Sequence, residues 1–159
     1  MDQSKEQAYN LNNSEEHKIF YNRWARTYDD DFAKNNNYIY PSEVAKVFKS
    51  TVDADVKSVA DIGCGTGLVG NELRKNEYTN IDGADFSQKM LNLVPKNTYQ
   101  NLYKIDLNQK LDITDNNYEG ITCVGTFTFG HVNPPALDEM IRICKTGSSI
   151  CFTINIGIY

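Results

Sequence analysis

The amino-acid sequence predicts an α/β protein whose doubly wound, mainly parallel sheet carries helices on both faces. Three observations predict this fold class. From about residue 56 onward, short apolar segments rich in β-branched residues alternate with segments of helical periodicity. Successive apolar segments are separated by the length that the crossover of a βαβ unit requires. The first of them leads into the glycine-rich turn Asp61-Ile62-Gly63-Cys64-Gly65-Thr66-Gly67, and sheets of this kind bind ligands at the ends of their strands.

Two segments precede this alternation. Residues 1–13 are rich in Asn, Gln, Ser and Glu and carry little apolar surface, so we expect a mobile tail. Residues 14–55 are expected to form two helices, and residues 56–159 a single core domain.

Apolar periodicity defines both N-terminal helices. Phe20, Trp24 and Tyr28 recur every four residues on one helix face, and this helix is expected to end near residue 35. Pro41 opens the second helix, because proline is favoured in the first helical turn. Apolar residues then follow the i, i+3, i+4, i+8 spacing of an amphipathic helix.

The core domain is expected to contain five strands and three helices. The strands are predicted at residues 56–62, 80–85, 102–106, 120–125 and 149–156. The helices are predicted at residues 68–75, from Ser87 to Pro95, and from Pro134 to about residue 146.

Composition narrows the classes of function. The net charge is -5, the pI is about 5.0, and Lys and Arg form no cluster that could neutralise several phosphates, which argues against a nucleic-acid partner. The N-terminus lacks the apolar region of a signal peptide, and no stretch of about 18 apolar residues occurs, so we predict a cytoplasmic protein without a membrane contact. The four cysteines form no C-x-x-C pair, which favours free, mostly buried thiols and no metal site.

The acidic residue of the glycine-rich turn discriminates between cofactors. Glycines at this point let the backbone approach a ligand closely, and the following helix presents unpaired N–H groups. A dinucleotide would place a pyrophosphate there, beside which the carboxylate of Asp61 would be unfavourable. S-adenosylmethionine has no phosphate and carries a sulfonium and an ammonium group, which a carboxylate attracts.

Two further carboxylates follow neighbouring strands. Asp85 ends the second strand, where it can accept both hydroxyl protons of a ribose. Asp106 ends the third strand and is placed to accept from the amine of an adenine ring. Apolar and backbone contacts at the same edge are expected from Phe86, Met90, Leu107 and Val124. No catalytic base can be assigned; His131 follows the fourth strand, but a histidine in a loop is more often solvated.

The sequence resembles class I S-adenosylmethionine-dependent methyltransferases. The segment Asp61 to Gly67 is similar to their motif I, and Gly83-Ala84-Asp85-Phe86-Ser87 to their motif II. The aromatic pattern Tyr21-x-x-Trp24-Ala25-x-x-Tyr28 resembles the N-terminal helix of the branch that acts on small molecules. Together with the segments at residues 124–132 and 136–139, it is closest to the Williams-Beuren-region methyltransferase-like proteins.

The resemblance implies a Rossmann-like sheet of strand order 3-2-1-4-5, with S-adenosylmethionine as cofactor and S-adenosylhomocysteine as product. It implies that Asp61 and the loop contact the methionyl end, that Asp85 binds the ribose and Asp106 the adenine, and that Trp24 or Tyr28 lies in a helical lid. The loop contacts are assigned to Gly63, Cys64, Gly65 and Gly67.

The family sheet has two further strands, which form an antiparallel hairpin beside strand five, whereas this chain stops at Tyr159. We therefore expect a truncated form, or a homodimer that pairs the exposed edge of strand five, because that strand carries neither charge nor proline to protect it.

These observations support methyl transfer from S-adenosylmethionine to a small-molecule acceptor. A chain that binds the cofactor without catalysis is the main alternative. An NAD-dependent oxidoreductase is a further one, because Gly65-x-Gly67-x-x-Gly70 also satisfies the dinucleotide pattern. A nucleic-acid amino-methyltransferase is disfavoured: Asn133-Pro134-Pro135 is followed by Ala136 instead of an aromatic residue, and the prolines suit the start of a helix.

Overall fold

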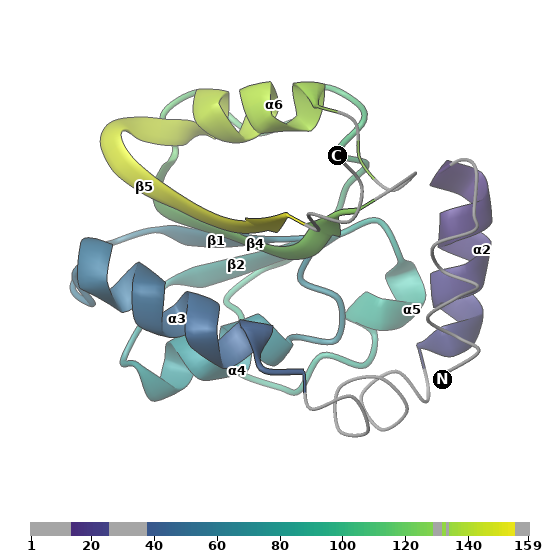
Figure 1. The fold of residues 1–159 in the computed structure, drawn as a ribbon, viewed down its shortest axis with the longest axis horizontal. Coiled ribbons are helices and arrows are strands. Elements are labelled where there is room, and N and C mark those ends of the chain that lie inside the picture. Colours follow the sequence, from purple (N-terminus) through teal and green to yellow (C-terminus); the bar gives the residue numbers. More distant parts are fainter. Residues whose placement is uncertain (1–13, 26–37, 129–131, 133, 155–159) are drawn as a thin grey trace.

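The computed structural model describes residues 14–25, 38–128, 132 and 134–154 as a five-stranded sheet with flanking helices (Figure 1). The sheet is parallel in every described pair, and its order is β3-β2-β1-β4-β5, as predicted. The strands are β1 (Val59–Ile62), β2 (Ile81–Asp85), β3 (Leu102–Lys104), β4 (Tyr118–Phe127) and β5 (Cys144–Ile154). The helices are α2 (Ser14–Trp24), α3 (Tyr40–Thr51), α4 (Leu68–Lys75), α5 (Gln88–Leu91) and α6 (Pro135–Ile143).

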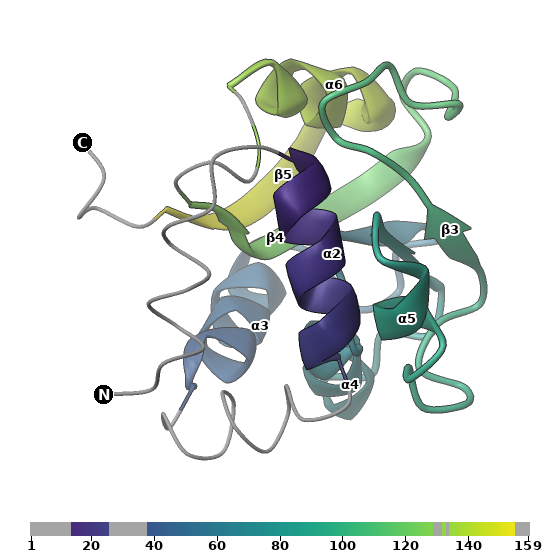
Figure 2. The ribbon, with the colours of Figure 1, turned by 90° about the vertical axis from the view of Figure 1, so that its right-hand side faces the viewer.

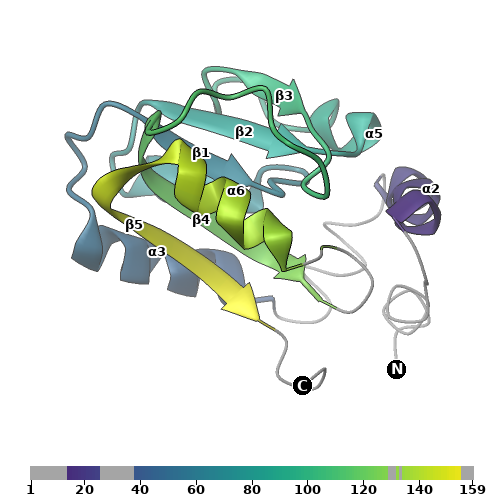
Figure 3. The same cartoon turned by 90° about the horizontal axis from the view of Figure 1, so that it is seen from above.

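Helices cover both faces of the sheet. Helices α3 and α4 lie on one face and α6 on the other (Figures 1 and 3). Phe48 of α3, Leu73 of α4 and Ile81 of β2 belong to the first apolar core. Ile121 of β4 and Met140 of α6 belong to the second. The central strands β1, β2 and β4 are thus mostly buried between these helices, whereas β3 is exposed and most of β5 is partly or fully exposed.

Helix α2 lies beyond the carboxyl ends of the strands (Figures 2 and 3). It packs beside α5, where Ser87 Oγ donates a hydrogen bond to Asn22 Oδ1 at 2.7 Å. Ser87 also caps α5, because its hydroxyl accepts the N–H of Met90. Within the described ranges, no helix is long and apolar enough to cross a membrane.

The predicted order of elements is confirmed, and several boundaries are corrected. The helix over residues 68–75 has the predicted ends. Strand β1 begins at Val59 instead of residue 56, since residues 54–55 form a turn. Strand β3 ends at Lys104, so Asp106 lies in the loop that follows the strand. Strand β4 extends from Tyr118 to Phe127, beyond both predicted ends.

The largest correction concerns β5. It begins at Cys144, directly after α6, and not at Ser149. Strand β4 advances two residues from Tyr118 to Gly120 while β5 advances five, from Cys144 to Ser149, and the additional residues form a bulge at Gly147, whose φ is 84°.

All four cysteines are free: Cys64, Cys123 and Cys144 are buried, and Cys151 is partly buried. The predicted tail, Tyr28, His131 and residues 155–159 lie outside the described part of the chain.

Candidate functional site

The carboxyl ends of the first four strands open into a cavity of about 760 Å³, part of which is open to solvent. Eight of the predicted site residues line it: Gly63, Gly65, Asp85, Phe86, Met90, Asp106, Leu107 and Val124. The cavity wall is completed by residues that were not predicted as contacts: Tyr21, Ala84, Ile105, Asn108, Gly125, Thr126 and Val132. A concave, mainly apolar lining with a few polar groups is typical of small-molecule sites.

The glycine-rich loop is folded tightly against its neighbours. Gly63 has a φ of +74°, and a Cβ on it would lie 2.2 Å from Thr126 Oγ1, so only glycine fits between β1 and β4. The N–H groups of Gly63 and Cys64 both donate to the carbonyl of Ala84. By contrast, a Cβ on Gly65 would meet no atom within 4 Å, which shows that this position faces open space.

Asp85 is held by backbone donors on both oxygens. Its Oδ2 accepts the N–H of Gly65 at 2.9 Å, and its Oδ1 accepts the N–H of Ser87 at 2.8 Å. The residue is 7% exposed, and burial raises the pKa of its carboxyl, although these backbone donors lower it. Each carboxylate oxygen retains lone pairs that can accept a hydroxyl proton from the cavity.

Asp106 and Leu107 form the far wall of the cavity. Asp106 Oδ1 accepts the N–H of Asn108 at 2.9 Å, which fixes the turn after β3. Leu107 is 8% exposed and anchors the turn in the core beneath α6. The wall therefore offers a carboxylate next to an apolar surface, a combination that suits a heterocycle with an exocyclic amine.

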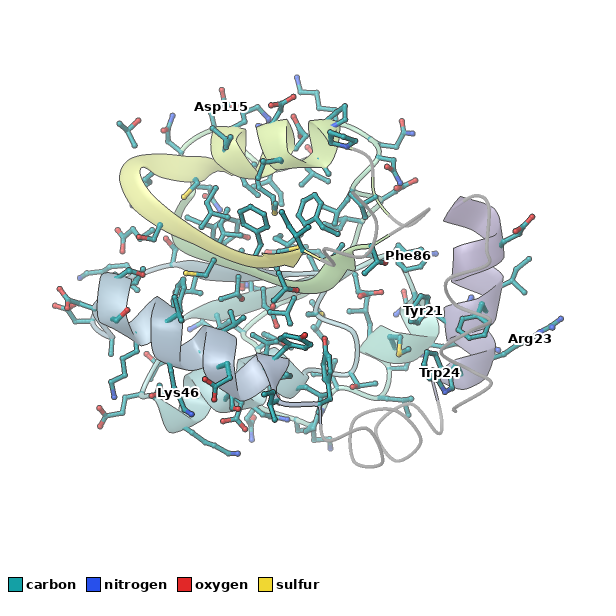
Figure 4. The ribbon with its side chains drawn as sticks, viewed as in Figure 1. Tyr21, Arg23, Trp24, Lys46, Phe86 and Asp115 are labelled. Carbon is teal, nitrogen blue, oxygen red and sulfur yellow. The ribbon has the colours of Figure 1, made fainter. Side chains whose placement is uncertain are left out.

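Aromatic side chains cover the opening near α2. The Tyr21 and Phe86 rings meet edge to face at 6.2 Å between their centroids (Figure 4). Arg23 points away from the cavity in the same view. The helical periodicity already places Tyr21 beside Trp24, but that pattern does not reveal which of the two faces the cavity.

Asp61 corrects one expectation, because it does not line the cavity. It is fully buried beneath the loop, where its Oδ2 accepts the hydroxyl proton of Tyr99 at 2.5 Å and its Oδ1 that of Thr122 at 2.9 Å. Burial raises its pKa to about 6, although both hydroxyl donors lower it. A direct contact with a methionyl group is therefore not part of this geometry.

Three other predicted contacts also lie away from the cavity wall. Cys64 packs in the core on the α3 and α4 side, where burial raises the pKa of its thiol. Gly67 precedes α4 and faces Val94 and Tyr99. Trp24 is 7% exposed and packs against the ring of Phe20, with 5.2 Å between the ring centroids.

Among the described residues, no group of three or more His, Cys, Asp or Glu side chains could hold a metal ion.

Comparisons with known proteins agree with this arrangement. The model of a family described as a methyltransferase domain matches residues 59–147, which contain the glycine-rich loop and both cavity carboxylates. The chain belongs to this family. Human methyltransferase-like protein 27 is 31% identical over 138 residues, which are 84% of this chain and 56% of that protein.

Two solved structures show the shared methyltransferase fold. One is a Haloferax volcanii methyltransferase in complex with the Trm112 methyltransferase activator (TM-score 0.68, 18% identity, 84% of this chain and 59% of that one). The other is described as an S-adenosyl-L-methionine-dependent methyltransferase from Methanococcus maripaludis (TM-score 0.65, 24% identity, 88% and 64%). The chain thus spans between 56% and 64% of the length of these three relatives.

Proposed function

We propose that this protein binds S-adenosylmethionine and transfers its methyl group to a small-molecule acceptor. The observation that carries the proposal is that one cavity brings together the open face of Gly65, the backbone-held carboxylate of Asp85 and the carboxylate of Asp106. This set matches a ligand with a ribose and an adenine and without a phosphate. The family to which the chain belongs supports the same cofactor.

Asp85 is assigned to the ribose. Its two oxygens are fixed by the N–H groups of Gly65 and Ser87, so the carboxylate is oriented before a ligand arrives. A preoriented, buried acceptor forms short charge-assisted bonds to hydroxyl groups without a large loss of side-chain entropy.

The adenine is assigned to the wall between α5 and the loop after β3. Met90 and Leu107 are buried there and can pack on the two faces of a flat ring, while Asp106 accepts from its amine. Phe86 closes the side of this wall toward α2.

The acceptor is assigned to the part of the cavity between α2 and the end of β4. When bound, S-adenosylmethionine supplies an electrophilic methyl group on a positively charged sulfur. The chain's own contribution is to align an acceptor with that methyl group and to exclude water, because Tyr21, Val124 and Val132 offer apolar walls and Thr126 a hydroxyl.

A small acceptor is supported by the charge and by the cavity. The net charge of -5 disfavours a polyanionic substrate, and no Lys or Arg is among the residues that line the cavity. The narrower assignment to the Williams-Beuren-region branch is also a proposal, supported by the aromatic pattern of residues 20–28.

Calorimetric titration with S-adenosylhomocysteine tests the cofactor assignment. We expect saturable binding by the native sequence. Asp85→Asn should weaken this binding roughly 10- to 100-fold, because the group that accepts hydrogen bonds from the ribose loses its charge. Asp82→Asn is the matched control: Asp82 lies on the same strand, but it binds Asn101 and Tyr118 outside the cavity. Absence of binding at about 0.1 mM protein, or equal losses in the two variants, would contradict the assignment.

Transfer is tested separately with labelled S-adenosylmethionine and a panel of small amines, thiols and phenols. Methylation of any member supports the complete proposal. Cofactor binding without turnover of any member would favour a binding function without catalysis. Saturable binding of NADH in place of S-adenosylhomocysteine would favour the dinucleotide alternative.

A further inference from the structure

One row of residues crosses the centre of the sheet beneath the glycine-rich loop. In the parallel registers, Asp61 of β1 lies opposite Gly83 of β2 and Thr122 of β4. Gly83 has no side chain, and the ring of Tyr99 occupies the space above it: a Cβ on Gly83 would lie 2.8 Å from Tyr99 Cδ2. The missing side chain therefore lets a residue from the loop before β3 reach the carboxylate of Asp61.

The same ring is enclosed on its other side by α4. A Cβ on Gly70, in the first turn of α4, would lie 2.4 Å from Tyr99 Cζ. The loop that carries the ring is fixed to this helix, because Arg74 Nε donates to the Thr98 carbonyl at 2.8 Å and Thr98 Oγ1 donates to Asn71 Oδ1 at 2.9 Å. The requirement for glycine at position 70, which resembles a dinucleotide pattern in the sequence, is accounted for by this ring.

The Tyr99 hydroxyl contacts the carboxylate of Asp61. Among the described residues, no cation lies beside this carboxylate to neutralise its charge. The hydroxyl donates to Asp61 Oδ2 at 2.5 Å, while Thr122 donates to Oδ1 at 2.9 Å. Hydrogen bonds to the ionised form keep a buried carboxylate charged against the cost of its burial. Asp61 is followed two residues later by Gly63, which forms part of the cavity wall.

We infer that Tyr99 is a positioning residue of the cofactor site, whose ring sets the spacing of β2 and α4 and whose hydroxyl holds the Asp61 carboxylate beneath the glycine-rich loop. This inference rests on the proposed function. Tyr99 does not line the cavity; it acts through Asp61, whose negative charge favours a cationic methionyl group above the loop. The Asp61 carboxylate thus attracts the ligand electrostatically from beneath the loop and does not contact it directly.

The titratable groups around Asp61 are few. Among the described residues, the charge of Asp85 raises the pKa of Asp61, whereas Tyr99, Thr122 and the backbone N–H of Gly70 lower it. The thiols of Cys64 and Cys123 also interact with this carboxylate, and burial raises the pKa of both. Both thiols are neutral near pH 7, and burial also raises the pKa of Asp85, so the comparison of Tyr99→Phe with a control variant that leaves Asp85 unchanged isolates the titration of Asp61.

Tyr99→Phe removes the hydroxyl and keeps the ring. Loss of one bond to the ionised form should move the titration of Asp61 upward by about one to two pH units. Near pH 7, where Asp61 of the native sequence is mostly ionised, the variant should bind S-adenosylmethionine, which carries the positively charged sulfonium, roughly 2- to 10-fold more weakly. Affinity should recover at about pH 8.5, which loss of packing alone would not produce.

Tyr78→Phe is the matched control. Tyr78 is 1% exposed, lies in the same apolar core, and donates its hydroxyl to the Val52 carbonyl, away from the loop. Both variants lose a buried hydroxyl, but only Tyr99→Phe should shift the pH profile of binding. Equal pH profiles for Tyr99→Phe and the native sequence would overturn the inference.

A second measurement, without ligand, separates this inference from the proposed function. The melting temperature falls with rising pH while Asp61 loses its proton. In Tyr99→Phe this fall should continue to a pH one to two units higher than in Tyr78→Phe, because Asp61 stays protonated to higher pH. An unchanged profile would overturn the coupling of Tyr99 to Asp61 even if the ligand binds. Failure of the native sequence to bind S-adenosylhomocysteine would overturn the cofactor site itself, while the ligand-free profile still decides whether Tyr99 controls the charge of Asp61.

Discussion

The buried carboxylate of Asp61 should make the stability of this protein depend on pH. Its pKa in the folded state is about 6, against 3.8 for an unperturbed aspartate. Below pH 3.8 most of both the folded and the unfolded chains carry the proton, and the contribution of this group to the stability is present in full. As the pH rises through 6, the folded protein loses this contribution, because the unfolded chain releases its proton more easily. The difference of about two pKa units corresponds to roughly 3 kcal/mol.

Asp61→Asn tests this reasoning, because the amide has the shape of the carboxyl group and stays neutral. The Thr122 hydroxyl can rotate to accept from the amide, so the hydrogen bonds of the site are largely retained. At pH 8 the variant should melt roughly 6–12 °C above the native sequence, and at pH 4 the two should melt together. Thermal unfolding followed by circular dichroism between pH 4 and pH 8 measures the difference.

Two results would refute this account of Asp61. A difference in melting temperature that does not change with pH would show that the carboxylate does not titrate in this range. A variant less stable than the native sequence at pH 8 would show that the ionised carboxylate stabilises the fold. The same variant should bind S-adenosylmethionine more weakly, which would show that the site retains a destabilising charge for its function.

Three further changes test packing, capping and association. Gly70→Ala should lower the stability by roughly 1–3 kcal/mol in urea unfolding, because its Cβ would lie 2.4 Å from the Tyr99 ring, and an unchanged midpoint would contradict that contact. Ser87→Ala should cost about 1 kcal/mol and release α2 to proteolysis, since Ser87 caps α5 and binds Asn22; equal cleavage rates would count against this anchor. We also propose a homodimer through the outer edge of β5, which no described strand pairs: light scattering should detect dimers that Phe152→Lys, at a position 36% exposed, converts to monomers, and a monomeric native chain would exclude this interface.

The sheet could be predicted from the sequence because each strand has a local signal. Apolar runs, the glycine-rich turn and the cap at Ser87 are all readable within a few residues, and they fix the order of elements. The start of β5 could not be predicted in this way. Residues Lys145 to Ser148, which follow its first residue, have the composition of a loop, and they belong to the strand because Gly147 adopts a positive φ at the bulge.

The candidate site shows the same division. Asp85 and Asp106 were identified because parallel strands bring their carboxyl ends to one edge, which follows from topology alone. The orientation of Asp61 was not, because it depends on Tyr99, 38 residues away, reaching across a glycine on a neighbouring strand. A cross-strand row of this kind becomes visible only when the register of the sheet is known.

The attachment of α2 has a thermodynamic consequence. Helix α2 is joined to the turn after β2 through Asn22 with Ser87 and through Tyr21 with Phe86, and the same turn begins at Asp85. A ligand that packs against Tyr21 and bonds to Asp85 therefore binds best when the helix is docked. Thermodynamic linkage then requires the two effects to be equal. The ligand increases the equilibrium constant for docking of α2 by the same factor by which docking of α2 increases the affinity for the ligand. We therefore expect ligand binding to increase the protection of helix α2 from hydrogen exchange.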